Sequence, residues 1–366
     1  MNYARSRRLT LIAAMALTGV STTHAGPFQM NRVAADAQWL AHLDVQALAN
    51  SQLVKHVLEH GKEMSIDIEG LDEIHEHLGI DPLKDLRDIT AYGNGDPHAE
   101  DGTFVAIITA TPAVDDLIAM LKLQDEAYSQ LEVAGYSLQS FNADGHATFF
   151  YVVPGSAESD RVVVLSKSSE HLVRGLGVME GKLPNLNQQA KSALAVTPRS
   201  GSYFFAASDG LGWIHGHDDD ENEDDDDDDR HDPASTVMRD AKSAMVNIGE
   251  AEGSTFLDLA IATEKDETAV NLADLFRGLL AMGKLAANND PELAAFKATL
   301  QGVKLTSANS TIRIQVEQKT TDIIEMLKSM HDKHMKDQEV HDDEADDSDS
   351  QGTRVEIKVR STTQPD

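Results

Sequence analysis

Two stretches of the sequence, about 150 residues apart, repeat one pattern of β-branched and aromatic residues. They are 102–111 (GTFVAIITAT) and 254–263 (STFLDLAIAT), and both carry Thr-Phe near the start and Ala-Thr at the end. This composition predicts a strand. A stretch with apolar residues at i, i+3, i+4 and i+7 follows each of them, at 113–121 and 269–282. That spacing predicts an amphipathic helix, so the chain is expected to contain one structural unit twice.

A hairpin and an opening strand complete each predicted unit. The hairpin strands show a period of two, which is typical of half-buried antiparallel strands. They are 136–141 with 147–153 in the first unit, and 303–307 with 311–316 in the second. The opening strands are 39–44 and 203–208, followed by predicted helices at 45–59 and 235–245. The sequence therefore predicts an α+β fold of two similar halves, each a mainly antiparallel sheet with helices packed on one face.

The N-terminus has the features of an export signal. Arg5, Arg7 and Arg8 precede the apolar stretch Leu9–Val20, and small residues precede a cleavage site after Ala25. The stretch is too short for a membrane-spanning helix and predicts a secretory signal peptide, although twin-arginine export stays open. No other stretch predicts a membrane span, and the chain has no cysteine for a lipid anchor or a disulfide. A periplasmic or secreted protein is expected.

The second half contains an acidic segment that no fold can bury. Residues 218–232 hold twelve carboxylates and one arginine, Arg230. Repulsion keeps such a segment solvated, so a disordered surface loop is expected between strand 203–208 and helix 235–245. The predicted boundaries are 1–25 for the signal peptide, 26–198 for the first repeat, 199–331 for the second repeat with its disordered insert 215–233, 332–352 for a second acidic disordered segment, and 353–366 for a C-terminal strand or tail.

Histidines beside the two acidic segments make them candidate cation sites. The predicted ligands of the first are His215, His217, Asp218, Asp220, Asp224, Asp226, Asp228, His231 and Asp232. Those of the second are His331, His334 and His341, which fall within about 80° on one helix face. Glu223 occupies the position where an EF-hand loop needs glycine, so that motif is excluded. Weak binding of Ca²⁺ or other divalent cations is expected, with no other cofactor and no identified catalytic residue.

The formal net charge of −31 excludes nucleic acid as a partner and favours divalent cations or a basic protein or polymer. The sequence has no Gly-x-Ser-x-Gly, His-Glu-x-x-His or phosphate-binding Gly-x-x-x-x-Gly-Lys motif. Two classes of function are therefore open. The first is an exported non-catalytic binding or structural protein. The second is an extracytoplasmic hydrolase with a site that the sequence does not reveal. The oligomeric state is not predicted.

Residues 34–48 (AADAQWLAHLDVQAL), followed by the repeated strand, helix and hairpin, resemble a group of uncharacterised exported proteins of planctomycete-type bacteria. The resemblance extends over most of the chain after the signal, but the acidic segment is not part of it. It implies export and the predicted fold. The group has no assigned activity, so the resemblance implies no mechanism.

Overall fold

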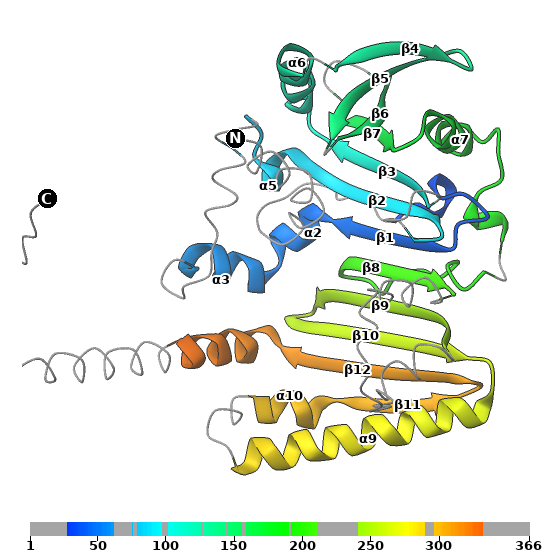
Figure 1. Cartoon of the computed structure of the whole chain (residues 1–366). Coiled ribbons are helices and arrows are strands. Elements are labelled where there is room, and N and C mark those ends of the chain that lie inside the picture. Colours follow the sequence, from blue (N-terminus) through cyan, green and yellow to red (C-terminus); the bar gives the residue numbers. More distant parts are fainter. Residues whose placement is uncertain are drawn as a thin grey trace, which may run out of the picture.

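A computed structural model describes residues 28–61, 75, 79–96, 102–125, 127–143, 145–155, 159–189, 192–210, 241–289 and 296–331. Within these residues the strands form one continuous twelve-stranded sheet (Figure 1). Its order is β11-β12-β10-β9-β8-β1-β2-β3-β7-β6-β5-β4, and neighbouring strands are antiparallel. The predicted α+β class is confirmed.

The strands are β1 (Trp39–Asp44), β2 (Leu86–Asn94), β3 (Thr103–Ala110), β4 (Ser129–Val133), β5 (Tyr136–Ala143), β6 (His146–Val153), β7 (Arg161–Ser166), β8 (Ser202–Asp209), β9 (Ala241–Ala251), β10 (Ser254–Thr263), β11 (Lys304–Ala308) and β12 (Thr311–Lys319). The α-helices are α2 (Val45–Asn50), α3 (Gln52–His60), α5 (Pro82–Asp85), α6 (Val114–Gln124), α7 (Ser169–Met179), α9 (Asp266–Asn289) and α10 (Lys297–Gly302). Short 3-10 helices are η1 (Met30–Arg32) and η2 (Leu186–Gln188), and residues 320–331 are also helical. No helix among these described residues is long and apolar enough to cross a membrane.

The two halves share this sheet, and β1 pairs with β8 where they meet (Figure 1). From this pair outward, the order is β1-β2-β3-β7-β6 in the first half and β8-β9-β10-β12-β11 in the second. A helix follows the third strand in both halves, α6 in one and α9 in the other. The strand order therefore repeats, as the sequence pattern predicts. The halves form one sheet because their opening strands, β1 and β8, pair with each other.

The strand order also corrects the predicted match between the hairpins. Strand β7 lies beside β3, and β12 lies beside β10, so the counterpart of β11–β12 is β6–β7 and not β5–β6. Strand β4, which the sequence did not predict, pairs with β5 and extends the first half further. It is only five residues long (SQLEV), and its two apolar side chains, Leu131 and Val133, are half-buried against the core, which is too short a pattern to indicate a strand by itself.

Two predicted helices differ from the structure. Residues 241–245, the end of the helix predicted at 235–245, belong to β9, which pairs with β8 on one side and β10 on the other. Two neighbouring strands outweigh the helix propensity of Ala, Lys and Met. The helix predicted at 45–59 is divided at Ser51, whose backbone is extended. The Ser51 hydroxyl accepts a hydrogen bond from the amide of Val54 at 3.2 Å and so caps α3.

Alternating side chains build a core on each face of the first half. Ile107 and Val164 point to the face covered by α7, where they join the buried Leu172. Ile108 and Val163 point to the other face, which α2, α3 and α6 cover. Helix α9 covers this second face at the other end of the sheet, through a cluster that includes Ala269, Leu272 and Ile312.

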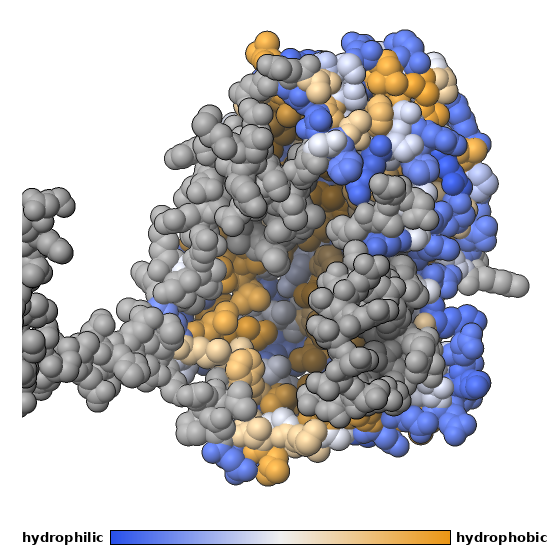
Figure 2. All heavy atoms as spheres, in the orientation of Figure 1, coloured by the Kyte–Doolittle hydropathy of each residue, from blue (hydrophilic) through white to orange (hydrophobic). Residues whose placement is uncertain are grey.

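Apolar side chains of the second face are visible in the middle of Figure 2. Register places Ile248, Leu257 and Val316 side by side on neighbouring strands of this face, and each side chain is half-buried. Ile248 packs against the core that α2 and α3 cover. The sheet face between α3 and α9 is therefore apolar.

Candidate functional site

The connection between β8 and β9 contains the first acidic segment. Residues 211–240 lie outside the described part of the chain, but both flanks are described. Asp209 at the end of β8 pairs with Ser243 of β9, and the amide of Gly210 donates a hydrogen bond to the carbonyl of Lys242 at 2.7 Å. The two ends of the connection are therefore held next to each other. The matching connection of the first half, between β1 and β2, holds α2 and α3.

The described part of the chain contains one of the twelve predicted metal ligands, His331. The nine from His215 to Asp232, together with His334 and His341, lie outside the described residues. The C-terminal strand or tail predicted at 353–366 lies outside them as well. His331 is described and is half-buried near the end of helix 320–331. Within the described part of the chain, no three His, Asp or Glu residues are grouped so that they could hold a metal ion. The predicted cation sites therefore stay predictions.

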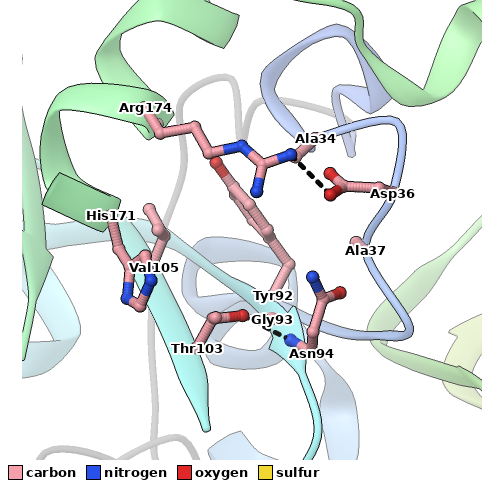
Figure 3. Close-up of a pocket in the computed structure, with 11 residues that line it drawn as sticks. Ala34, Asp36, Ala37, Tyr92, Gly93, Asn94, Thr103, Val105, His171 and Arg174 are labelled. Atoms are coloured by element: carbon pink, nitrogen blue, oxygen red, sulfur yellow. Dashed lines mark hydrogen bonds and ion pairs between the residues drawn. The ribbon is translucent and has the colours of Figure 1, made fainter. Parts of the chain in front are cut away.

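A small pocket lies between α7, the ends of β2 and β3, and the loop before β1 (Figure 3). Arg174 of α7 forms an ion pair with Asp36 of that loop at 2.5 Å, and Tyr92 points toward the guanidinium. His171 and Asn94 also line the pocket. The free space is about 20 Å³, which accommodates about one water molecule.

Tyr92 contributes a buried hydroxyl to this pocket. The side chain is 3% exposed, its hydroxyl has no hydrogen-bond partner among the described residues, and burial raises its pKa. An unpaired buried hydroxyl is costly, and one water molecule in the pocket would satisfy it. A Cβ atom at Gly175 would lie 3.3 Å from this hydroxyl and 2.9 Å from Val105 Cγ1. Glycine at 175 therefore lets α7 pack closely here, and the pocket suits a structural water better than a substrate.

Buried polar side chains form a second cluster, on β1, β2 and β3. Asp44 and Asp88 are directly opposite each other on neighbouring strands, and each is 7% exposed. The hydroxyl of Thr109 donates to Asp88 at 3.2 Å. His42 and Thr90 are opposite each other in the same register and are hydrogen-bonded at 2.9 Å. The sheet thus places two carboxyl groups and an imidazole in its interior.

Burial shifts the pKa of all three titratable groups. Desolvation raises the pKa of Asp44 to about 6, although backbone amides of α2 donate to its carboxylate. Desolvation also raises the pKa of Asp88 to about 6, and the Thr109 bond and the charge of Arg32 oppose the rise. Burial and the nearby Arg32 lower the pKa of His42 to about 4. These groups therefore link the stability of the fold to pH.

A pair of histidines on α3 is a feature that the sequence predictions did not include. The rings of His56 and His60 stack with centroids 4.4 Å apart and an interplanar angle of 27°. The His56 Nε2 atom is buried without a hydrogen-bond partner. Burial lowers the pKa of His56, the charges of Lys328 and His60 lower it further, and Glu59 opposes them. The sequence signal is the order His-x-x-Glu-His at 56–60, which is the reverse of His-Glu-x-x-His.

Comparisons with known proteins give only weak structural similarity. No protein-family model and no curated protein matches the chain. Among solved structures, crystal form III of the treponemal protein TP0453 has a TM-score of 0.43 at 9% identity, covering 84% of this chain and 100% of the other. Crystal form IV has a TM-score of 0.39 at 8% identity, covering 83% and 97%. These values describe a loose similarity of chain arrangement and carry no statement about function.

Proposed function

We propose that this is an exported, non-catalytic binding or structural protein whose acidic segment, residues 215–232, collects divalent cations or docks a basic partner. The observation that supports the proposal most is the anchoring of this segment. Twelve carboxylates and one arginine lie on a connection whose flanks are held together by the β8–β9 pairing. A tether at both ends keeps these carboxylates at high local concentration around a fixed point of the sheet.

The chemistry of the segment suits weak binding at several positions. Carboxylate oxygens are ligands that Ca²⁺ prefers, and its flexible coordination tolerates irregular spacing. Each bound ion relieves repulsion between neighbouring carboxylates but must also order the backbone around it. The attraction acts largely between solvent-exposed charges, so monovalent salt weakens it. The histidines at the ends of the segment add imidazole ligands.

The alternative, an extracytoplasmic hydrolase, needs a pocket in which polar groups converge on a substrate. The pocket at Tyr92 has room for about one water molecule. A substrate does not fit there, so a hydrolase would need a site elsewhere on the chain.

Calorimetric titration with Ca²⁺ tests the proposal. One variant deletes residues 215–232 and rejoins the chain with a short Gly/Ser linker. A second variant keeps the length and changes every Asp to Asn and every Glu to Gln in the segment. It tests the effect of charge separately from the effect of length. We expect several weak sites in the parent that weaken with added NaCl, and fewer sites in both variants, which keep the second acidic segment at 332–352. Equal uptake of Ca²⁺ by the parent and both variants would contradict the proposal.

A further inference from the structure

We propose that α3 provides a transition-metal site, separate from the acidic segment, with His56 and His60 as its ligands and Zn²⁺, Ni²⁺ or Cu²⁺ as the ion. The two residues are one helical turn apart, so their side chains leave the same face of the helix. Their rings are already in contact, with centroids 4.4 Å apart. Two imidazoles at this spacing are a recurring pair of zinc ligands on helices.

A hydrogen bond holds the His60 ring in the tautomer that can bind a metal through Nε2. Its Nδ1 lies 3.2 Å from the backbone carbonyl of His56. A carbonyl oxygen only accepts, so Nδ1 carries the proton and the lone pair of the neutral ring is on Nε2. Histidines that bind metals usually donate their other N–H to a carbonyl or carboxylate in this way, which fixes the tautomer and the ring orientation.

The second ring provides independent support. His56 Nε2 is buried and has no hydrogen-bond partner in the described part of the chain. A buried polar atom without a partner is costly, and coordination of an ion would satisfy it. A metal needs both nitrogens at about 2.0–2.1 Å, so the stacked rings must turn about their side-chain torsions to converge on it.

The surroundings determine which ion fits and how tightly it binds. Imidazole nitrogen suits Zn²⁺, Ni²⁺ and Cu²⁺, whereas Ca²⁺ prefers oxygen, so this site differs in chemistry from the acidic segment. The exposed Glu59 lies within about 100° of both histidines around the helix and attracts a cation. Lys328, on helix 320–331, is close enough to act on His56 and opposes the metal. No third ligand is grouped with the pair in the described residues, which leaves the other coordination positions to water.

Zinc titration of the full-length chain tests the site. The parent in this experiment is the chain with Asn in place of the six other candidate histidines, and every variant is made in it. These histidines are His215, His217, His231, His331, His334 and His341. Excess Ca²⁺ occupies the carboxylates. We expect His56→Ala and His60→Ala each to weaken Zn²⁺ binding at least tenfold, while His146→Ala, at an exposed position on β6, leaves it unchanged. Lys328→Gln should tighten binding several-fold, because it removes the opposing charge.

A matched variant tests the spacing. The double change Lys55→His and His56→Ala keeps the number of histidines but separates them by five residues, about 140° around the helix. It should bind Zn²⁺ as weakly as His56→Ala. Parent-like binding by this variant, or by His56→Ala and His60→Ala, would overturn the proposal. Circular dichroism checks that each variant is folded. Ca²⁺ uptake by the acidic segment is measured separately, which distinguishes failure of the Ca²⁺ proposal from failure of the zinc site.

Discussion

Replacing Asp88 with asparagine changes one buried carboxyl group on β2 into a neutral amide of nearly the same shape. The amide oxygen can still accept the hydrogen bond from Thr109. The folded state holds the pKa of Asp88 at about 6, above the ordinary 3.8, because burial disfavours the charged form. Its contribution to stability is therefore fully present below about pH 4 and is lost as the pH rises through 6.

The size of this effect follows from the interval between the two pKa values. At about 1.4 kcal/mol for each pH unit, the rise from 3.8 to about 6 corresponds to about 3 kcal/mol at pH 7. The Asp88→Asn variant does not lose this amount, although its new amide hydrogens need partners at a cost that does not depend on pH. The free energy of unfolding of the variant, relative to the parent, should therefore increase by roughly 2–3 kcal/mol between pH 4 and pH 7.

Urea denaturation at a series of pH values measures this difference, with the fluorescence of Trp39 on β1 as one probe. Asp116→Asn, at an exposed position on α6, is the matched control and should follow the parent at every pH. His42 titrates with the opposite sign, since its pKa is lowered to about 4 and its contribution is lost as the pH falls below 6.5. Both proteins contain His42, so its contribution to stability cancels when the variant is compared with the parent. Parallel pH profiles for the parent and Asp88→Asn would refute the assignment of a buried, high-pKa carboxyl group.

Three further predictions concern packing and export. Gly93→Ala should destabilise the protein by several kcal/mol in urea denaturation, because the added Cβ would lie 1.8 Å from the carbonyl oxygen of Thr103. Leu172→Ala should cost about 2–5 kcal/mol in the same assay, because the side chain is fully buried in the core under α7, whereas Leu123→Ala, 88% exposed on α6, should change stability by less than about 0.5 kcal/mol. N-terminal sequencing of the exported protein should show cleavage after Ala25, and a mature form that keeps the first residues would contradict the predicted signal peptide.

Features that depend on local sequence could be predicted before the structure. The strands at 103–110, 146–153 and 311–319 contain enough Val, Ile, Phe and Thr to show their pattern without knowledge of their neighbours. The sequence alone also predicts that 218–232 is exposed to solvent, because no chain can supply partners for so many buried carboxylates, and these residues lie outside the described part of the chain. The order His-x-x-Glu-His at 56–60 is also visible in the sequence without the fold. Only the structure shows the ring stacking and the unpaired Nε2 atom of His56.

Features that depend on partners distant in the sequence were decided by the tertiary structure. Residues 241–251 have Ala, Ser, Met, Asn, Gly and Ala at one set of alternate positions and Lys, Ala, Val, Ile and Glu at the other, and so show little contrast between their two faces. They form a strand because β8 and β10 lie on either side and satisfy the backbone. The pairing of β1 with β8 that joins the two halves, and the opposition of Asp44 and Asp88, likewise arise only when strand edges meet. Local periodicity shows which segments can pair, but the choice of partner depends on which edges remain open once the whole sheet has formed.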